Sequence, residues 1–122
     1  MPERDPTYEA TCLFCRIAAG EVPSDRVYED EAVVVFRDIN PRAPTHVLAI
    51  PRRHLASVDD LTEDAADQSL LAALLAALRR VAADEGLRGY RIVTNVGPES
   101  GQSVFHLHFH LLGGRLMSWP PG

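Results

Sequence analysis

Three of the five histidines in this 122-residue chain lie in one short segment, His106-Leu107-His108-Phe109-His110. A spacing of two is the spacing of a β-strand, in which successive side chains point to opposite faces. All three imidazoles are therefore expected on one face, with Leu107 and Phe109 on the other. Near neutral pH an imidazole can act as a nucleophile, an acid or base, or a metal ligand. The pattern predicts a functional site on this strand.

Three interpretations of the histidine segment follow from the residues themselves. A chance cluster on a solvated face is the least favoured, because the chain has so few histidines. Alternate histidines could bind a catalytic zinc ion. A neutral imidazole could instead attack phosphorus and form a covalent intermediate. The preceding Gly101-Gln102-Ser103 favours this third interpretation for His108 and His110, because a glycine turn can point N–H groups at an anion and Ser103 adds a hydroxyl.

Composition indicates one soluble globular domain, with 46% hydrophobic and 24% charged residues. The net charge of −5 argues against nucleic acid held on a broad basic surface, although a small anion could still bind locally. All twelve basic residues are arginine, which excludes a catalytic lysine and a lysine-bearing phosphate loop. The sequence contains no apolar run of about 18 residues, so no membrane span is expected.

The first ten residues are polar and contain two prolines. They lack the charged-then-apolar order of a signal peptide. We expect residues 1–10 to be a flexible leader, residues 11–122 to form the single domain, and the protein to be cytoplasmic. In that compartment Cys12 and Cys15 should be reduced.

Hydrophobic periodicity predicts an α+β domain with one short and one long helix. The short helix covers residues 12–19 and stops at Gly20. Leucines and alanines at helical spacing predict the long helix, with Asp60 or Thr62 as its N-cap and Gly86 at its end. β-Branched and aromatic runs predict five strands, which form a mostly antiparallel sheet and cover residues 26–29, 32–37, 46–50, 90–95 and 104–112.

Cys12 and Cys15 have the two-residue spacing of a zinc knuckle. A redox pair would require a thioredoxin-like strand before it, and residues 8–11 are not a convincing strand. Two small buried hydrophobic side chains are the remaining alternative. His54 has no obvious core role, which favours the zinc interpretation.

The chain resembles the histidine triad (HIT) family, and within it the Hint branch of histidine triad nucleotide-binding proteins of the zinc-containing bacterial type. The histidine segment resembles the family motif, in which three histidines alternate with apolar residues. Further similar blocks stand in the family's order, at residues 36–46, 50–54, 101–104 and 119–122, so the resemblance covers nearly everything from Cys12 to Gly122.

The resemblance implies a HIT fold whose five strands extend to a ten-stranded sheet across a homodimer. It implies hydrolysis of purine nucleoside 5′-phosphoramidates, as by an adenosine 5′-monophosphoramidase, with His108 as the nucleophile that carries the nucleotide. Catalytic roles are also implied for His110, His46 and Ser103. The implied nucleotide contacts are Asp38 with the ribose, Ile39 and Phe36 beside the base, the phosphate-side residues Asn95, Gly101, Gln102, Ser103, His108 and His110, and Trp119, which reaches the partner's site.

The resemblance also implies a structural zinc ion held by Cys12, Cys15, His54 and His106. Four protein ligands would close the tetrahedron and leave no open position for chemistry. No cofactor is then required for catalysis. This zinc site would join the N-terminal turn and the His54 loop to the catalytic strand.

Two other functions fit the same residues. Sister branches of the family hydrolyse dinucleoside polyphosphates or transfer nucleotides, and the Trp119-Pro120-Pro121-Gly122 tail argues against that activity. A nucleotide-binding regulatory scaffold with incidental catalysis is the second alternative. Ser118 departs from the familiar eukaryotic Hint tail, which has a histidine before the tryptophan, so the leaving-group preference stays open.

Overall fold

The structure is a computed structural model that describes residues 4–122; Met1 to Glu3, the start of the expected leader, lie outside the described residues. The described chain contains two α-helices, five β-strands and two short 3-10 turns. In chain order these are α1 (Leu13–Ala18), β1 (Arg26–Glu29), β2 (Val33–Arg37), β3 (Thr45–Pro51), η1 (Val58–Asp60), α2 (Ala65–Asp84), β4 (Tyr90–Val93), η2 (Pro98–Ser100) and β5 (Phe109–Gly113).

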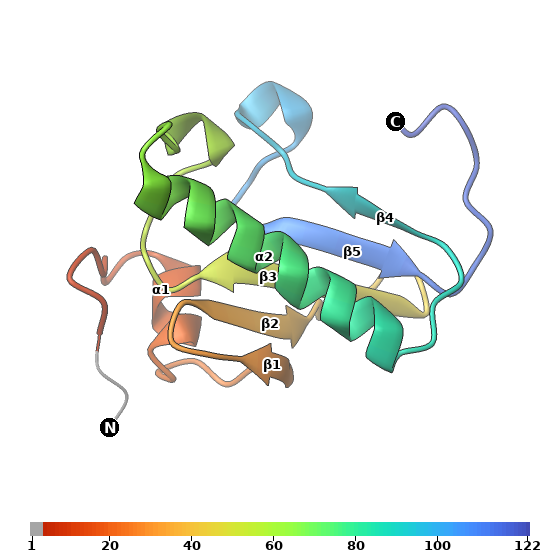
Figure 1. Cartoon of the computed structure of the whole chain (residues 1–122), viewed down its shortest axis with the longest axis horizontal. Coiled ribbons are helices and arrows are strands. Elements are labelled where there is room, and N and C mark those ends of the chain that lie inside the picture. The colour runs from red at the N-terminus through yellow and green to blue at the C-terminus, as the bar shows by residue number, and fades with distance from the viewer. Residues whose placement is uncertain (1–3) are drawn as a thin grey trace.

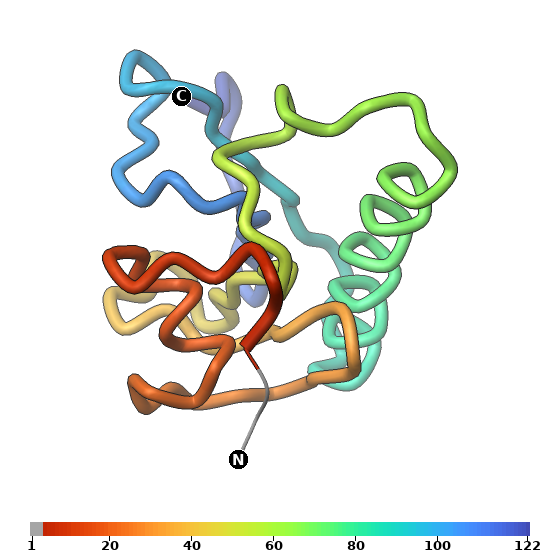
Figure 2. The backbone as a smooth tube through the Cα atoms, turned by 90° about the vertical axis from the view of Figure 1, so that its left-hand side faces the viewer, coloured from red at the N-terminus to blue at the C-terminus, as the bar shows by residue number. Residues whose placement is uncertain are grey.

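The strands form one sheet in the order β1-β2-β3-β5-β4, and every neighbouring pair is antiparallel. Helix α2 covers one face of this sheet, and α1 with the N-terminal segment lies on the other (Figures 1 and 2). The predicted α+β class and the five-stranded antiparallel sheet are confirmed. Strands β1 and β4 are the two edges.

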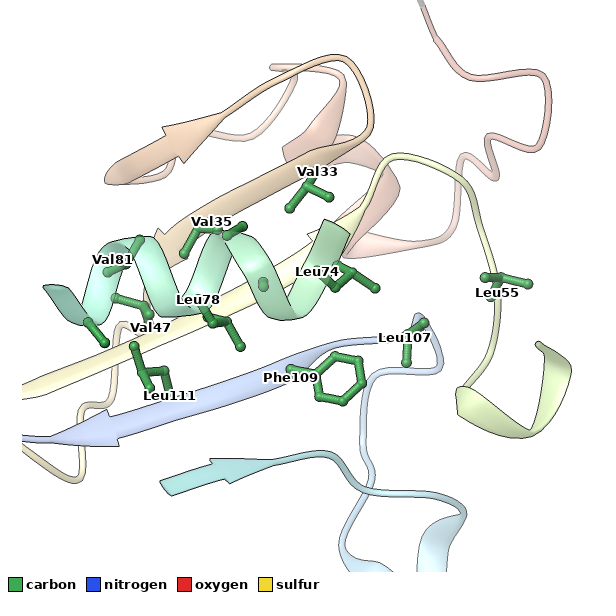
Figure 3. Packing of buried hydrophobic residues seen from close by; sticks show 13 residues of the cluster. Val33, Val35, Val47, Leu55, Leu74, Leu78, Val81, Leu107, Phe109 and Leu111 are labelled. Carbon is green, nitrogen blue, oxygen red and sulfur yellow. The ribbon is translucent and has the colours of Figure 1, made fainter. Parts of the chain in front are cut away.

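The larger hydrophobic core lies between α2 and the sheet (Figure 3). Leu74, Leu78 and Val81 of α2 pack against alternate residues of the strands, including Val47 of β3 and Leu111 of β5. Leu74 and Leu78 are fully buried. Each contributes about 1.5–3 kcal/mol by leaving water. This packing fixes which face of β5 points away from α2.

A smaller core lies on the opposite face, beneath α1. Phe14 and Ile17 of α1 pack against Val34, Phe36 and Leu48 of the sheet. Gly20, with a φ of 79°, ends the short helix as predicted, since a positive φ favours glycine. The site residues on the histidine face therefore meet α1 rather than α2.

The predicted start of the long helix is wrong. Asp60 lies in η1 and accepts from the Ala56 N–H, while Asp64 occupies the N-cap of α2 without a side-chain cap bond. The buried carboxylate of Asp67 instead reaches back to the N–H and hydroxyl of Thr62 and forms an ion pair with Arg53. Asp67 lies inside the helix, so an N-cap pattern did not indicate it. The predicted end is confirmed, because Gly86 has a φ of 66° just after α2.

The predicted start of the histidine strand is also wrong, because β5 begins at Phe109 rather than at residue 104. The pairing of β5 with β3 stops at Ala49 and Phe109, although β3 runs on to Pro51. Leu107 donates its N–H to the Leu55 carbonyl instead. The alternation still holds, since Leu107 joins the α2 core while His106 and His108 pack against Phe14 on the other face.

Residues 4–10 contact the domain at several points. Arg4 and the Tyr8 hydroxyl both bind the Glu21 carboxylate, and the Thr7 hydroxyl accepts the His54 N–H at 2.6 Å. The flexibility expected for residues 1–10 stays a prediction. Within residues 4–122, no helix combines the length and apolar character that a membrane crossing requires.

Candidate active site and metal centre

His108 is the central residue of the histidine segment, between His106 and His110. Its Nδ1–H donates to the His106 carbonyl at 2.7 Å. The His108 carbonyl accepts the Thr94 hydroxyl at 2.7 Å, which fixes the backbone from the β4 side. With its single proton on Nδ1, a neutral His108 keeps a lone pair on Nε2. That nitrogen is available as a nucleophile.

His46 and His110 form a second imidazole pair beside His108. The His46 Nδ1 accepts the Arg42 N–H at 3.0 Å, so the proton of a neutral His46 lies on Nε2. That Nε2 lies 2.9 Å from the His110 Nδ1, which we assign as the acceptor. The His110 proton therefore lies on its Nε2. The rings of His108 and His110 are 5.1 Å apart, centroid to centroid.

Burial controls the protonation of this face. Burial lowers the pKa of His108 and of His46 below the usual imidazole value. For His110, burial and the neighbouring His108 and His46 lower the pKa to about 4. These imidazoles are therefore neutral near pH 7, where each offers one lone pair and one N–H.

The loop before the histidine segment is held by Gln102. Its side chain accepts the Gly97 N–H and donates to the carbonyls of Ala56 and Val104. The Gly101 and Gln102 amides donate to Pro98 and Gly97 carbonyls inside the loop. The phosphate contacts expected of Gly101 and Gln102 stay predictions, and the geometry assigns both residues a role in shaping the loop.

Ser103 and Asn95 remain the polar side chains on the phosphate side. Ser103 is exposed and lines a cavity of about 490 Å³ together with Cys12, Leu13, His54 and Phe105. Asn95 is half-buried just beyond β4. The structure brings these two to the same end of the sheet as His108, and their contact with a ligand stays a prediction.

The residues expected to hold the nucleoside lie at the end of β2. Phe36 is buried and packs edge-on against Phe14, with ring centroids 5.6 Å apart. Ile39 is 92% exposed, and Asp38 lies beside His46. Trp119 is 79% exposed, with the Arg91 guanidinium 5.8 Å from its ring centroid. An exposed Trp119 is compatible with the expected contact to a partner subunit, which stays a prediction.

A second cluster lies on the other side of His108. Cys12, Cys15, His54 and His106 bring two sulfurs and two Nδ1 atoms within 4.8 Å of one another. The two Nδ1 atoms are 3.2 Å apart, and His106 Nδ1 lies 3.3 Å from Cys12 Sγ and 3.5 Å from Cys15 Sγ. Cys15 Sγ lies 3.3 Å from His54 Nδ1.

These separations fit a tetrahedral zinc ion. Bonds of about 2.3 Å to sulfur and about 2.0 Å to nitrogen give ligand-to-ligand edges of about 3.3–3.8 Å. The His106 Nε2–H donates to the Pro51 carbonyl at 2.8 Å, which leaves its Nδ1 as a lone pair aimed into the cluster. Both cysteines are free thiols. The donor set, and the hydrogen bond to Pro51 that orients the His106 ring, fit a closed structural site.

Sequence patterns missed three residues that position the site. Phe14 packs edge-on against the His108 ring, with centroids 5.1 Å apart. Thr94 holds the backbone of His108, and the Arg42 N–H fixes the tautomer of His46. Arg42 contributes only its backbone N–H to this hydrogen bond, so no residue type at that position could have indicated it.

The antiparallel five-stranded sheet thus carries a face of histidines beside a Cys₂His₂ cluster. The HIT domain family matches residues 19–117. An uncharacterised HIT-like protein of Synechococcus elongatus is 50% identical over 111 residues, which cover 90% of this chain and 96% of that protein. A 14 kDa zinc-binding protein of Zea mays is 48% identical over 115 residues, which cover 93% of this chain and 90% of that protein.

A solved structure agrees with these relatives. The HIT family hydrolase of Legionella pneumophila superposes with a TM-score of 0.88 at 52% identity, covering 92% of this chain and all of that one. The chain therefore belongs to the HIT family.

Proposed function

We propose that the protein hydrolyses purine nucleoside 5′-phosphoramidates through a nucleotidyl-histidine intermediate on His108. One observation carries the proposal: the His106 carbonyl fixes the His108 proton on Nδ1, so that Nε2 keeps its lone pair beside His110. The similarity to HIT family hydrolases supports a hydrolytic reaction. The purine nucleoside phosphoramidate as substrate is what the resemblance to the Hint branch implies.

In the first step the His108 Nε2 attacks the α-phosphorus. A new P–N bond forms, the bond from phosphorus to the leaving nitrogen breaks, and that nitrogen leaves with its bonding pair and takes a proton from water. The imidazole becomes positively charged, and the His106 carbonyl stabilises that charge through its hydrogen bond with Nδ1–H. In the second step water attacks the phosphorus and releases a proton to solvent, which replaces the one the leaving nitrogen took. The P–N bond to His108 breaks, and its electron pair returns to Nε2 as the nucleoside monophosphate leaves.

The neighbouring side chains are proposed to hold the nucleotide. The His110 Nε2–H and the Ser103 hydroxyl would donate to phosphate oxygens, with Asn95 as a further donor. Asp38 would accept from the ribose hydroxyls, and Phe36 and Ile39 would contact the base. In this arrangement His46 acts on His110 rather than on the phosphate.

We propose that Cys12, Cys15, His54 and His106 hold a structural zinc ion. When bound, zinc would join α1, the His54 loop and the segment that leads into His108. The similarity to a zinc-binding protein and the closed donor set support this. Four protein ligands leave no position for substrate, so zinc takes no part in the chemical steps. Free thiols at Cys12 and Cys15 fit the cytoplasmic location that the sequence predicts.

Turnover measurements separate the proposed activity from its main alternative. We expect kcat/KM for an adenosine 5′-phosphoramidate to exceed that for diadenosine tetraphosphate by at least about 100-fold, because the second substrate must fit another nucleotide beyond the scissile bond. Steady-state rates of both substrates with the same enzyme preparation measure the ratio. A preference for diadenosine tetraphosphate would reverse the assignment to that of a dinucleoside polyphosphate hydrolase.

We also propose that two chains pair through β4. The outer edge of β4 has no strand beside it among residues 4–122. Tyr90 and Val93 of β4 are exposed, as is Val96 just beyond the strand. Edge pairing would extend the sheet to ten strands and satisfy the unpaired backbone groups. Sedimentation equilibrium should give twice the 13.4 kDa chain mass, and a monomer at micromolar concentration would contradict this.

A further inference from the structure

Asp38 is oriented by the backbone before any ligand arrives. Its Oδ1 accepts the Asn40 N–H at 2.8 Å, which closes a tight turn just after β2. The Asp38 N–H in turn donates to the His46 carbonyl at 3.0 Å. These two bonds hold the carboxylate in place, with Oδ2 3.4 Å from the His46 Nε2. The carboxylate therefore faces the imidazole pair as well as the solvent from which ribose would come.

His46 is the side chain through which this carboxylate can act on the reaction. It is 6% exposed and touches Arg42 through Nδ1 and His110 through Nε2. Its Nε2 lies within hydrogen-bond distance of the His110 Nδ1, and the Asp38 Oδ2 lies beside that N–H at an ion-pair distance of 3.4 Å. The Arg42 N–H already favours the Nε2–H tautomer of His46, and a carboxylate beside that N–H stabilises the tautomer further, which leaves the His110 Nδ1 as the acceptor.

We propose that Asp38 is a positioning residue that acts through His46 to hold the proton of His110 on Nε2, in addition to any contact with ribose. The inference rests on the proposed function, in which that Nε2–H donates to the phosphate. Asp38 would then contribute to kcat even for a nucleotide that has no ribose hydroxyls. If Asp38 only bound ribose, its substitution would raise KM, and that effect would vanish with such a substrate.

Asp38, His46 and His110 could be mistaken for a metal site, since their donor atoms lie within 4.8 Å of one another. The Arg42 N–H argues against it. It occupies the lone pair of the His46 Nδ1 and so keeps the proton on Nε2, the atom that would have to bind the ion. The cluster therefore keeps a proton on the His46 Nε2, from which it is donated to the His110 Nδ1.

The test compares Asp38→Asn on two substrates, an adenosine 5′-phosphoramidate and its 2′,3′-dideoxy analogue. Asparagine can still accept the Asn40 N–H, but its amide N–H would face the His46 Nε2–H, donor against donor. On the dideoxy substrate we expect kcat to fall about tenfold, part of the contribution of an aligned proton donor. Asp25→Asn, which neutralises an exposed carboxylate beside Arg37, is the matched control and should leave both rates unchanged.

A double mutant identifies the route. In a His46→Ala background, adding Asp38→Asn should change kcat on the dideoxy substrate by no more than about twofold, because the intermediary is already gone. A tenfold loss that persists in that background would overturn the inference. Equal kcat for the wild type and Asp38→Asn on the dideoxy substrate would overturn it as well and leave Asp38 with ribose alone.

Ring ¹⁵N shifts give a readout that does not depend on turnover. The wild type should show His46 and His110 as Nε2–H tautomers, and Asp38→Asn should turn His110 into a mixture. An unchanged His110 spectrum in the variant would contradict the positioning role. If the wild type hydrolysed no phosphoramidate, the proposed function would fail, and these spectra would still decide whether Asp38 sets the tautomer of His110.

Discussion

Replacing His108 with alanine or glutamine should lower the turnover of a nucleoside phosphoramidate by at least about 10⁴-fold, a loss of the size that follows removal of a nucleophile. The physical reason is that no other imidazole of the site combines a free Nε2 lone pair with an Nδ1–H held by a carbonyl. His110 presents its N–H outward, and His106 aims its lone pair into the sulfur cluster. Steady-state rates with a fluorogenic phosphoramidate measure the loss.

The adduct itself provides the direct check. Wild-type enzyme quenched in mid-reaction should carry the mass of a nucleotide on the peptide that contains His108, and the glutamine variant should not. Glutamine retains much of the volume beside Phe14, so circular dichroism of that variant should match the wild type. Product that accumulates without any labelled peptide, or a variant with wild-type turnover, would contradict the assignment of His108 as the nucleophile.

Removing the zinc ion should produce the largest change in stability. We expect chelation, or the variant Cys12→Ser, to lower the free energy of unfolding by about 4 kcal/mol, the stabilisation from an ion present at about a thousand times its Kd. For a chain of this size the melting temperature should fall by about 10–20 °C. The loss is expected because the proposed ligands come from the N-cap of α1, the His54 loop and the segment before β5, which the ion would join. Thermal unfolding with and without chelator measures the change.

Elemental analysis provides the control for that experiment. The wild type should contain about one zinc per chain and Cys12→Ser much less. His46→Ala removes a buried imidazole outside the cluster and should keep its zinc. Metal-free wild-type protein of unchanged stability would eliminate the zinc site.

The alternation of histidines with Leu107, Phe109 and Leu111 was enough to predict two opposite faces, because the period of an extended chain is independent of its partners. Residues 104–108 nevertheless lie outside the sheet, since Leu107 donates its N–H to the Leu55 carbonyl of the loop after β3 rather than to β3 itself. The start of α2 was misplaced because the hydrogen bonds that hold it are not those of an N-cap. Thr62 and Asp67 form bonds that skip the expected N-cap positions.

The sequence by itself determined the fold class and the histidine face, because side-chain type and spacing are local properties. The set of four zinc ligands came from the resemblance to the HIT family. Only the tertiary structure decided which nitrogen of each imidazole carries the proton. That choice depends on the carbonyls of His106 and Pro51 and on the Arg42 N–H. Backbone groups are the same in every residue, so their positions emerge only when the chain has folded.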